Sequence, residues 1–156
     1  VGEEYPEIEI QERLVDAMAA KMLDPEFNKG IEVIVLPNLY GDIVTDVAAE
    51  HQGGLGTASS SNIGNNYAMF EAIHGTAPYL MTHSRGHYAD PCSLIRAMGM
   101  MLAHIGYMDR KEELDRALHI CTVTERKKVV TTFVEDASTE EFTDYLIEKI
   151  QSFAET

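Results

Sequence analysis

Cysteine is scarce in this sequence, and none of its apolar runs is long. Only two cysteines, Cys92 and Cys121, occur in 156 residues. They fall on separate predicted helices without the spacing of a metal site, which excludes a disulfide-bonded scaffold and predicts buried, reduced thiols in a cytoplasmic protein. No apolar run approaches the roughly 20 residues of a membrane span, and no signal peptide opens the sequence. A membrane is therefore not an expected partner.

Basic residues are also few. Twelve lysines and arginines stand against 26 aspartates and glutamates, so the formal net charge is -14 at pH 7. The one basic cluster is Arg126-Lys127-Lys128. A chain with this charge balance repels nucleic acid and anionic membranes, so neither is expected as a partner. The sequence has no internal repeats, and its length is enough for one sizeable core.

An acidic pair follows an apolar run in the first third of the chain. Residues 31–36 are mainly β-branched or aliphatic, which predicts a buried strand that ends at Pro37. A helix is predicted for 42–52, and it places Asp42 and Asp46 one turn apart on one face. Two interpretations are open: an acidic first turn that complements the helix dipole, or oxygen ligands for Mg2+ or Mn2+. The spacing alone favours the acidic first turn.

Three further motifs follow in order. They are Gly-Gly-Leu-Gly at 53–56, Ser-Asn-Ile-Gly at 61–64 and Phe-Glu-Ala-Ile-His-Gly-Thr-Ala-Pro at 70–78. The first lacks the G-x-G-x-x-G spacing of a dinucleotide-binding fingerprint. Together with the acidic pair, the succession resembles the β-decarboxylating dehydrogenases, which act on isocitrate, isopropylmalate, homoisocitrate or tartrate. The resemblance extends over about residues 12–150.

This resemblance implies a fold and a domain organisation. The fold is the α/β/α arrangement of the isocitrate and isopropylmalate dehydrogenases, an α/β fold of which this chain would be the C-terminal portion. Residues 1–52 would belong to the smaller, dimer-forming domain with the metal aspartates, and residues 53–156 to the larger cofactor-binding domain. The family's substrate-binding arginines and catalytic tyrosine and lysine would precede Val1. Beyond the metal ligands no catalytic residue is expected here, and the isolated chain is predicted to be inactive.

The same resemblance assigns three aspartates to a metal. Asp16, Asp42 and Asp46 would bind Mg2+ or Mn2+. From its own sequence context, Asp16 is a solvent-facing charge inside a helix. In the family the matching carboxylate reaches into the active site of the partner subunit. The resemblance therefore implies a homodimer with shared active sites.

A second set of residues is assigned to the nicotinamide cofactor. In the family, the glutamate that matches Glu71 lies near the nicotinamide, and the segment that matches 74–78 wraps the adenosine. From the residues alone, His74 before Gly75 is equally a plain turn residue. The cofactor-binding residues that the resemblance implies are Asn62, Glu71, His74, Gly75, Thr76, Ala77, Pro78, Tyr79, Leu80 and Asp90.

The preference between NAD and NADP depends on a few positions. NAD-dependent relatives tend to have aspartate where this chain has Tyr79, and NADP-dependent relatives tend to have lysine. Glu125 matches a position that is a phosphate-binding tyrosine in some NADP enzymes, and a carboxylate there repels a phosphate. His83 and Arg85, in a loop that is longer than in the family, could supply positive charge instead. NAD is the expected cofactor, with NADP as the alternative.

The other elements are predicted from apolar spacing and capping residues. Helices are expected from Ile10 to Asp24-Pro25, from Asp90-Pro91 to Gly106, from Arg110 to Cys121 and from Glu140 to Phe153, with residues 138–142 as the cap of the last. Residues 59–66 are expected to form a turn-rich loop. Short strands are expected at 67–71 and 129–134.

The activity implied by the resemblance is a metal-dependent oxidative decarboxylation of a small 2-hydroxy acid with NAD(P)+. Isocitrate, converted to 2-oxoglutarate, is the preferred substrate because threonine at the position of Thr76 is commoner in isocitrate enzymes. Isopropylmalate, homoisocitrate and tartrate dehydrogenases are the alternatives within the family. A chain that keeps a dimer surface or a nucleotide loop without catalysis is the alternative from another class.

Overall fold

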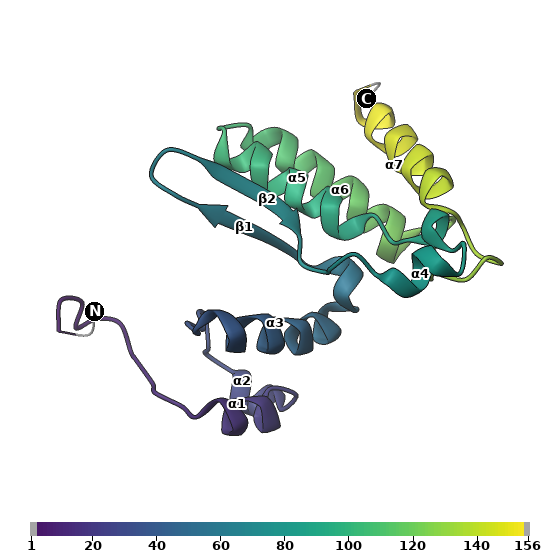
Figure 1. The fold of residues 1–156 in the computed structure, drawn as a ribbon. Helices are drawn as coiled ribbons and strands as arrows, with labels where there is room; N and C mark the ends of the chain where they lie inside the picture. The colour runs from purple at the N-terminus through teal and green to yellow at the C-terminus, as the bar shows by residue number, and fades with distance from the viewer. Residues whose placement is uncertain (1–2, 155–156) are drawn as a thin grey trace. The chain divides into compact units, whose positions relative to one another are not determined.

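The chain forms two compact units, residues 1–51 and 52–156, each of which is described here by itself. The structure is a computed structural model that describes residues 3–154, without the side chains of Gln52 and Leu55. Figure 1 shows helices throughout and a single two-stranded hairpin in the second unit. No helix in the described part of the chain is long and apolar enough to cross a membrane.

Three helices build the first unit. They are α1 (Val15–Lys21), α2 (Pro25–Asn28) and α3 (Asn38–Gln52). The Asp24 carboxylate accepts a hydrogen bond from the Glu26 N–H at 3.0 Å, and Pro25 follows it at the first helical position. A small core of Met18, Met22 and Val44 joins α1 to α3. The helix that the sequence predicts from Ile10 is shorter in the structure, where α1 begins at Val15.

The strand that was expected at 31–36 is not formed. These residues are irregular in the structure, and the side chains of Val33 and Val35 are 78% and 89% exposed. A strand forms its backbone hydrogen bonds with a neighbouring strand. None of the described residues 3–51 forms a strand that could pair with 31–36. The following helix, α3, begins at Asn38 rather than at Asp42, directly after Pro37.

The second unit begins with an antiparallel hairpin and continues with three long helices. Strand β1 (Ser59–Ile63) pairs with β2 (Ala68–Ala72), with Ser59 opposite Ala72 and Ile63 opposite Ala68. The helices are α5 (Cys92–His104), α6 (Met108–His119) and α7 (Thr139–Ala154). The shorter elements are η1 (Leu55–Thr57), α4 (Pro78–Thr82), η2 (Gly86–Tyr88) and the π-helical turn η3 (Ile120–Thr124).

Two sequence-based expectations for this unit were wrong. Residues 59–63 belong to β1 and not to a loop, because they pair with β2 and α5 packs on the hairpin. The expected strand at 129–134 is irregular, with Thr132 at a φ of 68°, since no neighbouring strand in the described part pairs with it. The strand expected at 67–71 is displaced by one residue.

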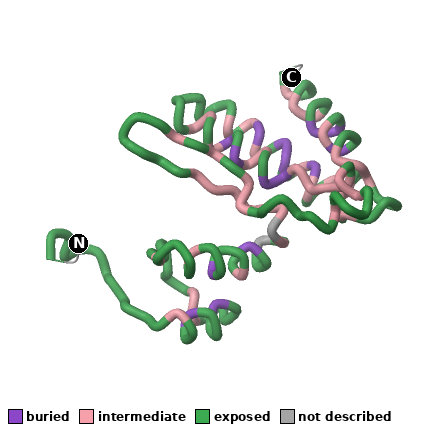
Figure 2. The backbone as a smooth tube through the Cα atoms, in the orientation of Figure 1, coloured by how far each residue is buried: buried purple, intermediate pink, exposed green. Residues whose placement is uncertain are grey.

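A single hydrophobic core holds α5, α6 and α7 together, and Figure 2 shows its buried residues on these helices. Both cysteines lie in it as free thiols, as predicted. Burial raises the pKa of both thiols. The fully buried members include Ala117, Leu118 and Cys121 from α6 and η3. The other buried members are Cys92, Leu114, Phe142, Tyr145 and Leu146.

The expected cap of the last helix is confirmed. The Ser138 hydroxyl accepts a hydrogen bond from the Glu141 N–H at 3.2 Å, and the Glu141 carboxylate accepts one from the Ser138 N–H at 2.9 Å. This reciprocal pair is a capping box. The backbone hydrogen bond from Ser138, followed by the bond from Lys128, lowers the pKa of Glu141 to about 2. Thr139 also donates to the Ala89 carbonyl at 2.6 Å, which ties the start of α7 to the segment before α5.

Ser93 is the buried polar residue that joins α5 to the hairpin. Its side chain is fully buried. The hydroxyl donates to the carbonyl of Ala58, just before β1, and accepts a hydrogen bond from the N–H of Ile73, just after β2, at 3.3 Å. One side chain thus reinforces two backbone groups at the open end of the hairpin, which otherwise bond only to each other, over a long 3.5 Å.

We expect Ser93→Ala to lower the free energy of unfolding by about 1–3 kcal/mol, because it removes a buried partner from two backbone groups. Urea denaturation followed by far-UV circular dichroism measures this change. Ser152→Ala is the matched control, since the Ser152 side chain is exposed and donates to a carbonyl of its own helix. Equal stability of the two variants would contradict the role assigned to Ser93.

Candidate functional site

The acidic pair lies on the exposed surface of α3. Asp42 and Asp46 are one helical turn apart, and both are exposed. The Asn38 amide lies 3.4 Å from Asp42 Oδ2, and the Thr45 hydroxyl donates to the Gly41 carbonyl at 2.7 Å. Neither carboxylate forms an ion pair with another described residue. Two carboxylates on one face without a cationic partner are available to a ligand.

Asp16 is placed on a different helix. It lies in the first turn of α1, exposed, and its Oδ1 accepts a hydrogen bond from the Ala17 N–H at 2.8 Å. Within residues 3–154, no three histidine, cysteine, aspartate or glutamate side chains come close enough to hold a metal ion. A single chain therefore does not unite Asp16 with Asp42 and Asp46. The prediction that Asp16 serves the partner subunit's site stays a prediction.

The chemistry of the acidic pair fits a hard divalent cation. Carboxylate oxygens are the ligands that Mg2+ and Mn2+ prefer, and Mg2+ is often held by only one or two carboxylates together with water and substrate oxygens. Because both carboxylates are exposed, they are free to share a cation with water and substrate oxygens. Asp42 and Asp46 would hold the ion, with Asp16 as a third carboxylate from a second chain.

The outer face of the hairpin carries two of the predicted cofactor residues. Side chains alternate along β2, so that Phe70 and Ala72 are half-buried while Met69 and Glu71 are exposed. Asn62 on β1 shares the exposed face with Glu71, and its amide donates to the Glu71 carboxylate at 2.8 Å. The strand pairing thus brings together two residues that are nine positions apart in the sequence.

The segment after β2 is an exposed turn with an unusual backbone. Ala77 has a φ of 45°, in the left-handed region that a residue with a Cβ rarely adopts. Its carbonyl accepts the N–H groups of Leu80 and Met81, at 3.0 and 3.4 Å, so that Ala77 begins α4 just before Pro78. The predicted cofactor residues of this segment, His74, Gly75, Thr76, Ala77, Pro78 and Tyr79, are all exposed, and Leu80 is half-buried.

Asp90 serves first as a helix cap. Its Oδ1 accepts a hydrogen bond from the Cys92 N–H at 2.9 Å at the start of α5. The residue is half-buried against Gly56, where an added Cβ would lie 2.9 Å from Asp90 Oδ2. The glycine motif at 53–56 therefore makes room for this cap. Any contact of Asp90 with a cofactor stays a prediction.

The two residues that could supply positive charge in the longer loop are engaged with aromatic rings. The His83 ring stacks on Tyr79, with centroids 4.1 Å apart, and its Nδ1 lies 2.9 Å from the Tyr79 carbonyl. The Arg85 guanidinium lies 4.9 Å from the centre of the Phe133 ring. These contacts hold both side chains within the unit.

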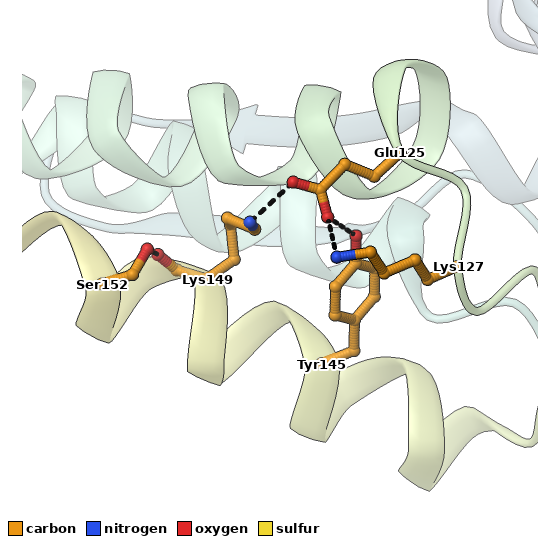
Figure 3. Close-up of polar contacts among 5 residues, drawn as sticks. All are labelled: Glu125, Lys127, Tyr145, Lys149 and Ser152. Atoms are coloured by element: carbon orange, nitrogen blue, oxygen red, sulfur yellow. Dashed lines mark hydrogen bonds and ion pairs between the residues drawn. The ribbon is translucent and has the colours of Figure 1, made fainter.

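Glu125 is the centre of a polar cluster that the sequence did not reveal. Its carboxylate accepts hydrogen bonds from the Tyr145 hydroxyl at 2.6 Å and from Lys149 Nζ at 2.7 Å, and Lys127 Nζ lies 2.8 Å away (Figure 3). The bonds from Lys127, Lys149 and Tyr145 lower the pKa of Glu125 to about 2. Burial, together with the bond to Glu125, raises the pKa of Tyr145. Because two ammonium groups compensate its charge, Glu125 repels a phosphate less than the sequence alone suggests.

Sequence-based reasoning also missed Ser93 and Arg96. Ser93 shows no signal, because a serine shortly after the predicted N-cap and proline is ordinary in sequence. Arg96 does have a sequence signal, because it is the only lysine, arginine, aspartate or glutamate in α5. A lone charge in an otherwise apolar or small-residue helix has to find a partner, water or a ligand.

Comparison with known proteins identifies the class. The family model of isocitrate/isopropylmalate dehydrogenases matches residues 1–147. The chain belongs to this family. The crystal structure of isocitrate dehydrogenase from Methylococcus capsulatus superposes with a TM-score of 0.84 at 34% identity, over 96% of this chain and 43% of that one. The predicted α/β fold of the isocitrate dehydrogenase type is confirmed.

The curated relatives include both NAD-type and NADP-type isocitrate dehydrogenases. The chain is 40% identical over 152 residues to a mitochondrial regulatory subunit of the NAD-type isocitrate dehydrogenase of Dictyostelium discoideum, a match that covers 96% of this chain and 41% of that protein. It is 44% identical over 118 residues to the NADP-type isocitrate dehydrogenase of Rickettsia typhi, over 75% of this chain and 23% of that protein. The chain thus spans less than half the length of these relatives. The cytoplasmic location stays a prediction.

The Glu125 cluster predicts a specific pH dependence. A lowered carboxyl pKa stabilises the fold above the ordinary value of 4.5, and this stabilisation is lost as the pH falls toward about 2. We expect Glu125→Gln to lower the melting temperature at pH 7, and the difference from wild type to shrink between about pH 4.5 and pH 2. Thermal unfolding over this range measures it. Glu148→Gln, an exposed change on α7, is the control, and a difference that is independent of pH would contradict the assignment.

Proposed function

We propose that this chain carries the metal-binding and cofactor-binding residues of an enzyme that oxidatively decarboxylates isocitrate to 2-oxoglutarate. The observation that carries the proposal is the acidic pair, Asp42 and Asp46, exposed on α3 without a cationic partner among the described residues in a chain of this family. The relatives that are named isocitrate dehydrogenases support isocitrate over other 2-hydroxy acids. Isopropylmalate, homoisocitrate and tartrate are the alternative substrates.

The carboxylates would act by binding a cation that attracts the anionic substrate. Isocitrate is a tricarboxylate, and a chain with a net charge of -14 repels it. Asp42 and Asp46, with Asp16 of a second chain, would bind Mg2+ or Mn2+ and so create a positive centre for the substrate. The bound cation would supply Lewis acidity toward the carbonyl that forms on oxidation.

The exposed face of the hairpin and the turn that follows it would bind the cofactor. Asn62 and Glu71 are held together by their hydrogen bond, which orients the Glu71 carboxylate on the outer face. The turn 74–78 offers backbone groups and the His74 ring to the adenosine. We propose NAD rather than NADP, because His83 and Arg85, which could supply positive charge to a 2′-phosphate, are engaged with Tyr79 and Phe133.

We propose a homodimer in which Asp16 completes the partner subunit's site. Support comes from the placement of Asp16 on α1, apart from the pair on α3, so that the described part of one chain does not assemble three carboxylates. Relatives that are named as subunits, among them the one from Dictyostelium discoideum, make a different second chain the alternative to a second copy.

A second candidate function is that of a non-catalytic chain in a larger enzyme. It is favoured by one observation, that the relative from Dictyostelium discoideum is named as regulatory. Such a chain would keep the dimer surface and the nucleotide-binding turn without a working metal site. Metal binding separates the two functions.

Metal binding is tested by titrating the purified chain with Mn2+ in the presence of isocitrate and following free Mn2+ by electron paramagnetic resonance. We expect Asp42→Asn to weaken binding by at least about tenfold, because one carboxylate ligand is lost. Asp109→Asn, an exposed aspartate of α6, is the control. Mn2+ binding that Asp42→Asn leaves unchanged would contradict the metal site and favour the non-catalytic chain.

The shared site is tested by mixing two variants. Asp16→Asn and Asp42→Asn chains each lack one carboxylate, but a mixed dimer has one site with all three, provided that Asp16 acts across the interface. We therefore expect each mixed dimer to recover one of its two Mn2+ sites, which is half of the wild-type number per dimer. If Asp16 acted within its own chain, every site would keep one defect and no recovery would appear.

Cofactor preference is tested by the fluorescence of reduced nucleotides. We expect the chain to bind NADH at least about tenfold more tightly than NADPH, a difference of about 1.4 kcal/mol. Arg85→Gln should leave both affinities unchanged, since this side chain lies over Phe133. Tighter binding of NADPH that Arg85→Gln abolishes would instead make Arg85 a ligand of the 2′-phosphate.

A further inference from the structure

A cavity of about 270 Å³ lies at the surface of the second unit, and none of its lining residues is among those assigned above to the metal or the cofactor. It is wide open to solvent and is formed where η1 and β1 meet α5 and α6. Its lining includes Thr57, Ser59, Arg96, Met100, Lys111 and Asp115.

Arg96 is a half-buried arginine with one unsatisfied donor. Its Nε is buried and makes no hydrogen bond. Among the residues that the structure describes, no carboxylate forms an ion pair with its guanidinium. A buried N–H without a hydrogen-bond partner is costly, and such donors in natural proteins are usually paired with protein, water or a ligand.

Ser59 provides a second donor with a poor partner. Its hydroxyl lies 3.1 Å from the thioether sulfur of Met100, to which it donates. A thioether is a weak acceptor, and an oxygen atom in the cavity would compete with it. Ser59 lies at the start of β1, next to the segment that Ser93 fixes through Ala58. The donor is therefore held in place by the buried hydrogen bonds of Ser93.

The charges of the lining favour an anion. Lys111 and Asp115 form an ion pair one turn apart on α6, so that they compensate each other. Arg96 then leaves a net charge of about one positive unit on the wall of the cavity. This wall is unusual in a chain with a net charge of -14.

Helix α5 packs on α6 beside the cavity. Gly99 is buried on α5, and an added Cβ would lie 3.6 Å from Lys111 Cγ and 3.7 Å from Asp115 Oδ1, which is ordinary van der Waals contact. The Lys111 and Asp115 side chains therefore lie next to α5 at the edge of the cavity.

We infer that this cavity is a binding site for a small oxyanion, a carboxylate or a phosphate group. The planar guanidinium of Arg96 offers parallel N–H donors that match two oxygens of such a group. The Ser59 hydroxyl would turn from Met100 to a further oxygen. Lys111 keeps its pair with Asp115, so the positive charge that attracts the anion is that of Arg96. The lining shares no residue with the proposed metal and cofactor sites, so the cavity would bind an effector or a second ligand rather than the reacting substrate.

The inference is tested by calorimetric titration of the full 156-residue chain with inorganic phosphate and, separately, with acetate. Sodium chloride at matched ionic strength controls for screening. We expect saturable binding of one anion per chain, with a Kd on the order of 1 mM for at least one of the two probes. The probe that binds more tightly identifies phosphate or carboxylate as the preferred group. The absence of saturable binding with both probes would overturn the inference.

Variants assign the binding to Arg96. We expect Arg96→Gln to weaken it at least about tenfold, and Arg96→Lys to weaken it also, because lysine keeps the charge and loses the planar fork. Arg116→Gln is the control, an exposed arginine of α6 that lies over Phe153. Binding that survives Arg96→Gln would overturn the inference, since the anion would then sit elsewhere.

Two further measurements keep the test decisive if Arg96→Gln does not fold. Ser59→Ala removes only a weak hydrogen bond to Met100, so this variant should fold and should weaken anion binding several-fold. The anion should also raise the melting temperature of the wild-type chain and of Arg116→Gln. Asp42→Asn should leave anion binding unchanged, and Arg96→Gln should leave Mn2+ binding unchanged. A failure of this inference is thereby distinguished from a failure of the proposed function.

Discussion

The buried hydroxyl of Ser93 is the interaction on which the second unit depends. It joins the residue before β1 and the residue after β2 to α5, so that both ends of the hairpin are fixed to one helix. A two-stranded hairpin is marginal in water by itself and needs such support. The predicted cofactor turn begins directly after Ile73, and Ser59 of the anion cavity directly follows Ala58. One serine therefore sets the position of two candidate sites.

Helix α5 carries different functions along its length. Asp90 caps its first turn and occupies the space that Gly56 leaves free. Its middle presents Arg96 to a cavity, and Gly99 lies beside Lys111 and Asp115 of α6. After α6, Glu125 binds Tyr145 and Lys149 of α7 and so completes the attachment of the last helix. The charge of Glu125 is thus compensated within the unit. The buried Nε of Arg96, in contrast, has no hydrogen-bond partner in the described part of the chain.

Sequence reasoning succeeded where the signal is local. The capping box at Ser138 and Glu141, the cap at Asp90 and the apolar spacing of α5 and α7 involve residues within a few positions, and each was predicted close to its observed place. It failed for two of the three expected strands and missed β1, because strand formation depends on a neighbour that the local pattern does not contain. The apolar residues 31–36 lack a partner strand in the described part of the chain and stay irregular, whereas the serine-rich residues 59–63 have β2 and become a strand.

The sequence by itself determined the family, the helices, the acidic pair on one helical face and the order of the motifs, since these depend on residue identity and short-range spacing. Only the tertiary structure decided that Glu125 is neutralised by two lysines, that Asn62 bonds to Glu71 across the hairpin, and that Arg96 faces a cavity with its buried Nε unpaired. These are contacts between residues brought together by the fold or consequences of burial. The burial of a charged side chain, and the presence or absence of an opposite charge beside it, are set by the fold and not by the local sequence.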